Sequence, residues 1–114
     1  MAPPDVSIHF ARLETGPSGG AHGSPDGMEE RTQAYLDFLA GPATALAAVS
    51  PRVVVLAHTA ASYLTEFSRE PALVDRLASL TGGRVITAAQ AVRAALQRLG
   101  VRTLALGTPY PESI

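Results

Sequence analysis

Three side chains that can take part in chemistry follow directly after the apolar run RVVVLA (residues 52–57): His58, Thr59 and Ser62. An imidazole can give or take a proton near neutral pH, because its ordinary pKa is about 6.5. The two hydroxyl groups can donate hydrogen bonds, and Ala60 is small enough to let a ligand approach the backbone. A strand that ends in a tight turn also presents backbone N–H groups to carboxylate or phosphate. This spacing therefore predicts an anion-binding site with His58 as its candidate acid or base.

The same residues also have purely structural interpretations. From the sequence alone, a histidine hydrogen-bonded at a strand end is the better explanation of His58, and small residues fit a tight turn without any ligand. Tyr110 follows a second apolar run, VRTLALG (residues 101–107), and stands between two prolines that restrict the backbone. The prolines can aim its phenol across the strand ends, or it can be a partly buried loop tyrosine. The sequence leaves both interpretations open at each position.

Several kinds of site are absent from the sequence. The chain has no cysteine and no lysine, which excludes a zinc–thiolate site, a cysteine nucleophile and a lysine Schiff base. The remaining histidines, His9 and His22, are too far from His58 in sequence to give metal-ligand spacing. Neither GxGxxG after a strand nor GxxxxGK[ST] is present. We therefore expect neither a metal nor a cofactor.

The composition indicates one globular domain, residues 1–114. Hydrophobic residues make up 46% of the 114-residue chain and charged residues 17%, enough for an aliphatic core. The net charge is −1 and the nine arginines are scattered, so nucleic acid is not an expected partner. No apolar run has the length of a membrane span, and the N-terminus lacks the layout of a signal peptide. We expect a soluble, cytoplasmic protein that does not enter membranes.

Strand patterns alternate with helix patterns along the chain. Residues 5–13 alternate apolar and polar side chains, whereas 52–57 are apolar throughout, which is typical of a parallel strand buried on both faces. The expected strands are 5–13, 52–57, 84–86 and 101–107, and the expected helices are 28–39, 43–49, 72–80 and 88–99. Residues 58–70 are expected to form a loop or a short helix. Residues 14–27 are rich in Gly, Pro and Ser and predict a flexible loop.

Local signals set the expected ends of the helices. Capping-box spacing occurs at Asp26 and Glu29 and again in TAAQ (residues 87–90). Gly41 and Pro42 are expected to break or kink the first helix. Pro71 suits the first turn of the next helix, and glycines follow the two later helices. The pattern indicates an α/β domain with a mostly parallel sheet, in which ligands gather at the carboxyl ends of strands.

Four segments in this order give the chain a family resemblance: VSIHFARL, RVVVLAHTAAS, GGRVITAAQAVRAALQRLGVRTLAL and TPYPESI. They resemble the aspartate/glutamate racemase superfamily, in the branch of maleate cis-trans isomerase and arylmalonate decarboxylase, from about Val6 to the end. The resemblance implies a flavodoxin-like, three-layer α/β unit that forms one half of a two-halved fold. It also implies cofactor-independent isomerisation, decarboxylation or racemisation of a small carboxylic or dicarboxylic acid between the halves.

The resemblance assigns roles by position. His58 stands where the family has its first-half cysteine, as acid or base. Thr59 and Ala60 stand at positions that bind carboxylate, although Ala60 offers only its backbone N–H, and Tyr110 matches a tyrosine that contacts the substrate. Ser62 is also a candidate substrate-binding residue, but only because its hydroxyl group can donate a hydrogen bond; the resemblance assigns it no role.

The chain departs from the family pattern in three respects. His58 replaces the first-half cysteine, which the arylmalonate decarboxylases also lack at that position. The second-half cysteine is missing, and the family's first strand is expected to lie before the segment that matches. We therefore expect a partial enzyme that needs a second half or a homo-oligomer. The alternatives are a non-catalytic carboxylate-binding or regulatory half, and an inactive truncated fragment.

Overall fold

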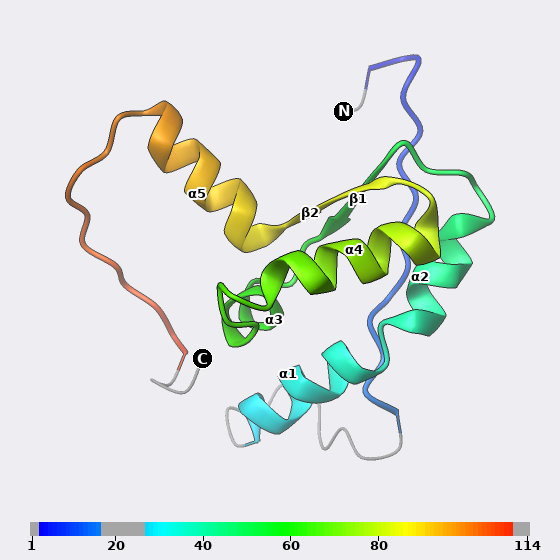
Figure 1. Cartoon of the computed structure of the whole chain (residues 1–114), viewed down its shortest axis with the longest axis horizontal. Coiled ribbons are helices and arrows are strands. Elements are labelled where there is room, and N and C mark those ends of the chain that lie inside the picture. Colours follow the sequence, from blue (N-terminus) through cyan, green and yellow to red (C-terminus); the bar gives the residue numbers. More distant parts are fainter. Residues whose placement is uncertain (1–2, 17–26, 111–114) are drawn as a thin grey trace.

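The computed structural model describes residues 3–16 and 27–110, which form five helices and two strands (Figure 1). In chain order these are α1 (Met28–Asp37), α2 (Ala40–Ala47), β1 (Val53–Leu56), α3 (Thr59–Leu64), α4 (Glu70–Thr81), β2 (Arg84–Thr87) and α5 (Ala88–Arg98). None of the described helices is both long and apolar enough to cross a membrane.

Strands β1 and β2 pair in parallel, as expected for strands joined through a helix. The register pairs Val53 with Arg84 and Leu56 with Thr87, so both strands end at the same edge of the sheet. Helix α4 lies in the connection between them and packs against β2 and against α2. The predicted α/β domain with a parallel sheet is therefore confirmed for the described residues.

The hydrophobic core lies between one face of this sheet and helices α2 and α4. Side chains alternate across the strands, so every second residue faces the helices. The buried cluster consists of Leu39, Ala43, Val54, Leu56, Leu77 and Val85. Burial of these aliphatic groups fixes α4 over the sheet and thereby fixes where β1 ends.

The opposite face of β1 is open, which corrects the expectation of a strand buried on both sides. Val53 and Val55 are 53% and 56% exposed, whereas Val54 and Leu56 between them are buried. An apolar run predicts that a strand is buried, but it does not show whether other elements cover one face of the strand or both. In the described residues only one face of β1 is covered.

Two expected strands, 5–13 and 101–107, are not strands in the structure. Both segments are extended and belong to no sheet among the described residues (Figure 1). Phe10 is 91% exposed and Leu106 is 77% exposed. Alternation gives a segment an apolar face, but a strand also needs a neighbouring edge for its backbone hydrogen bonds. The edges of the β1–β2 sheet do not pair with either segment.

Helix α1 begins after Gly27, which occupies the N-cap position with φ = 70°. This left-handed conformation favours glycine, and no side chain caps the helix. The expected capping box with Glu29 involves Asp26, which lies outside the described residues, as do residues 17–26 of the predicted loop. The helix ends at Asp37, within two residues of the expected end.

Of the other local signals, the one at Gly41 and Pro42 is wrong and the later ones are confirmed. Gly41 and Pro42 do not break α1 but lie in the first turn of α2, where a proline N–H is not needed. Pro71 is in the first turn of α4, and Gly82 ends that helix with φ = 71°. The predicted capping box of Thr87 and Gln90 is confirmed, because both of its hydrogen bonds are present.

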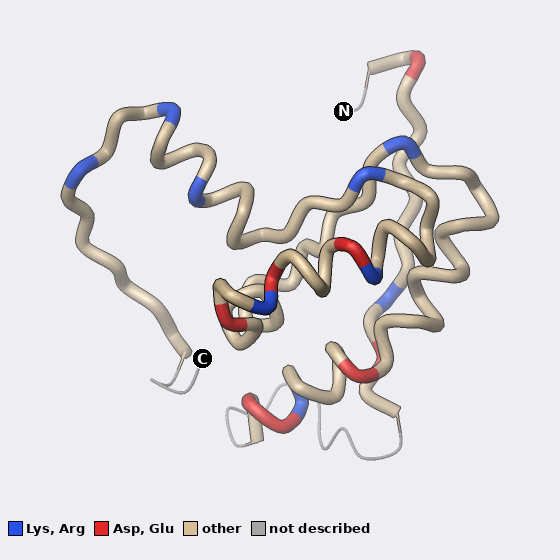
Figure 2. Tube along the Cα trace, viewed as in Figure 1, with Lys and Arg blue, Asp and Glu red and all other residues tan. Residues whose placement is uncertain are grey.

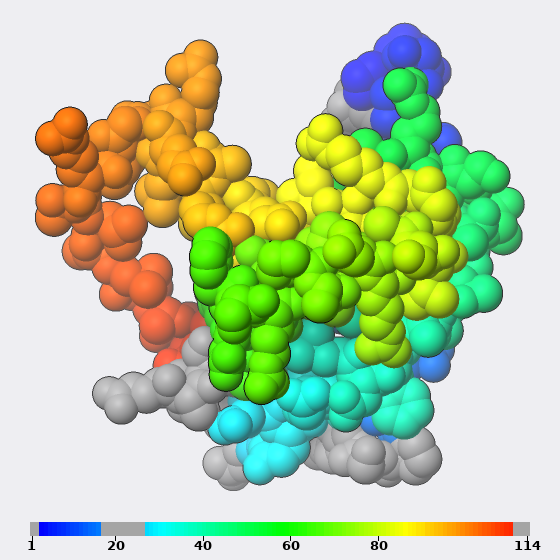
Figure 3. Space-filling model, in the orientation of Figure 1, coloured from blue at the N-terminus to red at the C-terminus, as the bar shows by residue number. Residues whose placement is uncertain are grey.

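Helix α5 and residues 101–110 form an arm that leaves the body of the protein. No residue of α5 is buried, and although α5 contacts α3, the space-filling view shows an open gap between α3 and the extended segment 101–107 (Figure 3). The arm carries three arginines and no acidic residue, whereas acidic and basic residues occur side by side in α1 and α4 (Figure 2). The arm returns to the body near its far end, where Tyr110 lies.

Candidate functional site

His58 occupies the N-cap of α3, directly after the turn that leaves β1. Its backbone is extended, with φ = −98° and ψ = 104°, and its Nδ1 accepts a hydrogen bond of 3.1 Å from the N–H of Ala61. Ser62 Oγ donates a 3.0 Å hydrogen bond to the His58 carbonyl. The structural interpretation of both residues is therefore observed: the His58 ring caps the short helix, and the Ser62 hydroxyl donates to the His58 carbonyl.

The cap determines the tautomer of the neutral imidazole. Because Nδ1 accepts from an amide, its lone pair is occupied and the proton of the neutral ring resides on Nε2. Partial burial lowers the pKa of His58 below its ordinary value, against a smaller opposing effect of a backbone hydrogen bond. His58 is consequently a neutral ring whose Nε2–H is a hydrogen-bond donor.

Thr59 and Tyr110 meet although 51 positions separate them in the chain. Their hydroxyl groups are hydrogen-bonded, and the N–H of Tyr110 donates to Thr108 Oγ1 at 3.2 Å. The Tyr110 ring also packs edge-on against Tyr63, with 6.1 Å between the ring centres. The contacts of Tyr110 with Thr59 and Tyr63 hold the end of the arm against α3.

A pocket of about 300 Å³ opens beside these residues. Helix α1 contributes one wall, and the β1–α3 turn and Tyr110 contribute the other. Its described lining residues are Met28, Arg31, Thr32, Tyr35, Ala57, His58, Thr59, Ala60 and Tyr110. This is the lower end of the range for small-molecule sites, so the pocket suits a small ligand rather than a polymer.

Four of the five residues predicted from the sequence line this pocket: His58, Thr59, Ala60 and Tyr110. Ser62 does not line it, because its hydroxyl faces the His58 carbonyl and the residue is 3% exposed. Of the other histidines, His9 is exposed in the N-terminal segment, and His22 lies outside the described residues.

The wall formed by α1 was missed from the sequence. Tyr35 packs against His58 with 5.0 Å between ring centres, and Arg31 lies one turn earlier on the same helix face. Arg31 is only 9% exposed, which is unusual for an arginine. The signal in the sequence is the i, i+4 spacing of Arg31 and Tyr35, which places both residues on one face of the helix.

No cluster of three or more His, Asp or Glu side chains that suits a metal ion occurs among the residues the structure describes. The pocket lining within that part of the chain contains no acidic residue. Its chemistry is therefore that of a guanidinium, a neutral imidazole and hydroxyl groups.

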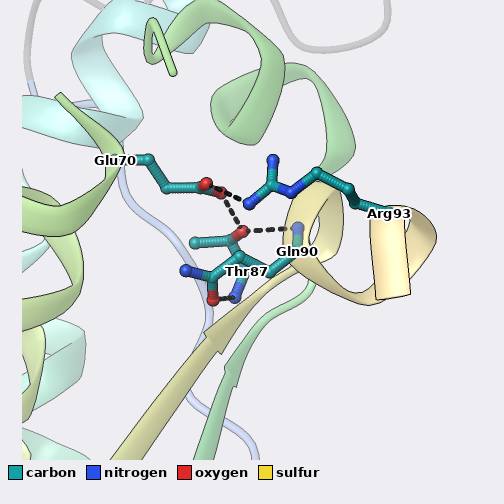
Figure 4. Close-up of polar contacts among 4 residues, drawn as sticks. All are labelled: Glu70, Thr87, Gln90 and Arg93. Atoms are coloured by element: carbon teal, nitrogen blue, oxygen red, sulfur yellow. Dashed lines mark hydrogen bonds and ion pairs between the residues drawn. The ribbon is translucent and has the colours of Figure 1, made fainter. Parts of the chain in front are cut away.

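A second polar cluster lies outside the pocket and joins α4, β2 and α5 (Figure 4). Glu70 is 4% exposed; its Oε1 accepts from Thr87 Oγ1 at 2.5 Å and its Oε2 from Arg93 Nη2 at 2.7 Å. The Arg93 guanidinium also lies 4.9 Å from the centre of the Phe67 ring. Burial raises the pKa of Glu70, but the hydrogen bonds from Thr87 and Arg93 outweigh burial and lower it overall.

This cluster has a structural function. A buried carboxylate is costly unless it is paired, and here both oxygens are satisfied. Thr87 serves twice, since its hydroxyl donates to Glu70 and accepts from the N–H of Gln90 at 3.0 Å. The cluster therefore fixes the direction in which α5 leaves the sheet, and with it the course of the arm toward the pocket.

Comparisons with known proteins assign no family: no family model, curated protein or solved structure matches this chain.

Proposed function

We propose that the pocket beside His58 binds a small carboxylic acid. The observation that carries this proposal is the convergence of Thr59 and Tyr110, from segments 51 residues apart, on a pocket that also contains His58 and Arg31. Hydroxyl, imidazole N–H and guanidinium groups are all hydrogen-bond donors that suit carboxylate oxygens. The resemblance to the racemase superfamily supports the same class of ligand.

The experiment is titration calorimetry of the purified chain with maleate, phenylacetate and phenylmalonate. We expect at least one acid to bind, and Tyr110→Phe to weaken that binding because it removes the hydroxyl at the pocket. Tyr63→Phe is the matched control, since Tyr63 packs against Tyr110 without lining the pocket. Absence of binding for all three acids, in a chain that unfolds cooperatively, would contradict the proposal.

The second candidate function is turnover of the acid. The resemblance implies that the reaction would be a cofactor-independent isomerisation, decarboxylation or racemisation. The lowered pKa of His58 favours it, because a base must be neutral to accept a proton. However, Nδ1 must first release the N–H of Ala61. Binding without turnover is therefore the state that the geometry supports best, as in a non-catalytic half.

Proton NMR separates these two functions. Maleate and phenylmalonate are incubated with the chain, and formation of fumarate or phenylacetate is followed with time. We expect binding without conversion by the chain alone. Conversion that disappears in His58→Asn, with binding of the acid retained, would establish His58 as the acid or base.

We also propose that the chain belongs to a flavodoxin-like, three-layer α/β unit that forms one half of a two-halved fold, and that a second half or a second copy covers the open face of β1. The exposed Val53 and Val55 support this, because the uncovered sheet face is apolar. Light scattering of the purified chain tests the second copy: a dimer that Val55→Arg dissociates is expected. A monomer would leave a separate second half as the source of that layer.

A further inference from the structure

We propose that His58, Thr59 and Tyr110 form a latch that opens when the His58 ring takes up a proton, and that its opening releases the end of the arm from α3. Such a latch would regulate the pocket beside His58, and that role rests on the proposed function. The latch itself consists of contacts within the chain, so it can be tested without a ligand.

One short helix holds the far end of the arm. The Tyr110 hydroxyl is hydrogen-bonded to Thr59, and the Tyr110 ring packs edge-on against Tyr63; both partners lie on α3. Residues 101–109 are exposed, and no residue of α5 is buried, although α5 contacts α3. The position of the far end of the arm therefore depends on the first turns of α3.

The His58 ring fixes the first turn of that helix. Its Nδ1 accepts the N–H of Ala61 at 3.1 Å, and the His58 carbonyl accepts the N–H and the hydroxyl of Ser62 at 3.1 and 3.0 Å. Ala61 is 0% exposed, so its N–H bears a desolvation cost if the ring stops accepting. Loss of the cap therefore loosens the turn that carries Thr59.

Protonation of the ring and the cap exclude each other. The proton of the neutral ring resides on Nε2, so an added proton must go to Nδ1, the atom that accepts from Ala61. An imidazolium donates from both nitrogens and cannot accept. The Ala61 N–H would then meet a second donor, so the charged ring has to leave the cap.

The described surroundings of His58 contain no anion that would stabilise the charged ring in place. Arg31 and Tyr35 face it from α1, and each already interacts with a further group of the protein. Tyr110 faces it from the arm, and no Asp or Glu lines this part of the described chain. Partial burial lowers the pKa of His58 while the latch is closed, whereas a solvated ring titrates near its ordinary value of about 6.5. A fall in pH through this window therefore favours the open latch.

Opening of the latch would change the pocket. Tyr110 forms part of the wall opposite α1, so release of the arm removes that side chain from the lining. The pocket is then complete at neutral pH and incomplete in acid.

The test measures the distance between the arm and the body as the pH is changed. The chain has no cysteine, so Leu106→Cys on the arm and Ser79→Cys on α4 give two unique positions for spin labels, both at exposed residues. Double electron–electron resonance is recorded at pH about 7.5 and about 5, on either side of the ordinary pKa of histidine. We expect one narrow distance at the higher pH. At the lower pH the population with longer or broadly distributed distances should increase about fivefold, the effect of losing one helix cap.

His58→Asn is the decisive variant, because asparagine caps a helix and takes up no proton in this range. Its arm should stay closed at both pH values. His9→Asn and His22→Asn are the matched controls; they remove the other two histidines and should keep the pH response. A pH response that persists in His58→Asn, or a distance distribution that is the same at both pH values in the unsubstituted chain, would overturn the latch.

An NMR titration of the unmodified chain covers the case in which His58→Asn does not fold. The His58 ring, the Ala61 N–H and the Tyr110 N–H should change with one common midpoint. A ring that titrates while the other two signals stay in place contradicts the latch. Neither measurement contains a ligand, so a failed latch leaves the carboxylic-acid site standing, and absence of acid binding in calorimetry leaves the latch standing.

Discussion

The hydroxyl groups of Thr59 and Tyr110 form a hydrogen bond that connects the first turn of α3 to the far end of the arm. Because no residue of α5 is buried, this bond and the packing of Tyr63 on Tyr110 hold the end of the arm in place. The pocket beside His58 is thus completed by Tyr110, which Thr59 and Tyr63 hold against α3.

Removing either hydroxyl should release the arm. We expect Thr59→Val or Tyr110→Phe to increase the rate of trypsin cleavage after Arg102 several-fold, because proteolysis follows local opening of an exposed segment. The double variant should be cleaved no faster than either single variant, since both remove the same bond. Additive increases would mean that the two hydroxyl groups act independently, and Tyr63→Phe should leave the rate unchanged.

The cap at His58 predicts a difference between two substitutions. His58→Ala removes the acceptor for the Ala61 N–H and should lower the free energy of unfolding by about 1 kcal/mol, whereas His58→Asn supplies a good cap and should cost less. Urea denaturation measures both values. Equal stability of the two variants would show that the cap does not contribute to folding.

The lowered pKa of His58 predicts how stability responds to pH. In the unfolded chain the ring titrates near its ordinary pKa of about 6.5, and in the folded protein it titrates lower. Between these values the unfolded state binds more protons, so stability increases as pH rises through this window and decreases as pH falls. NMR titration of the ring gives the folded pKa directly, and His58→Asn should flatten the stability curve there. A folded pKa above 6.5 would contradict the dominant effect of partial burial on the ring.

The pair of Glu70 and Arg93 predicts an acid-sensitive contribution at lower pH. Because hydrogen bonds lower the pKa of Glu70 in the folded state, its contribution is complete above the ordinary carboxyl pKa and is lost as pH falls through the folded value. Glu70→Gln should cost about 1.5–3 kcal/mol at neutral pH and reduce the acid slope of stability. Glu66→Gln is the control, since its ion pair with Arg69 is exposed and should matter little.

The sequence predicted the parts of the fold that depend on local signals. The Thr87–Gln90 capping box, the end of α4 at Gly82 and Pro71 in the first turn depend on residues a few positions apart, so their geometry follows from the local chain. The parallel pairing of β1 and β2 followed from the helix between them.

The sequence did not predict which segments pair as strands, or which faces of the sheet other elements cover. Residues 5–13 and 101–107 have strand-like patterns without a paired edge, and Val55 is apolar yet exposed. Such features depend on segments distant in the sequence, and a hydrophobic pattern does not contain this information. The same limit explains why Arg31 was missed: its importance arises only where α1 meets the β1–α3 turn.

The central claim is that a small carboxylate binds between α1 and the β1–α3 turn, and a ¹H–¹⁵N NMR titration with phenylacetate tests it most directly. A second pocket of similar volume, about 310 Å³, lies beside Arg69 and Arg76 and serves as the internal control. We predict saturable shifts of the Thr59, Ala60 and Arg31 signals and none around Arg76. Shifts confined to Arg69 and Arg76, or no saturable shifts at all, would contradict the claim.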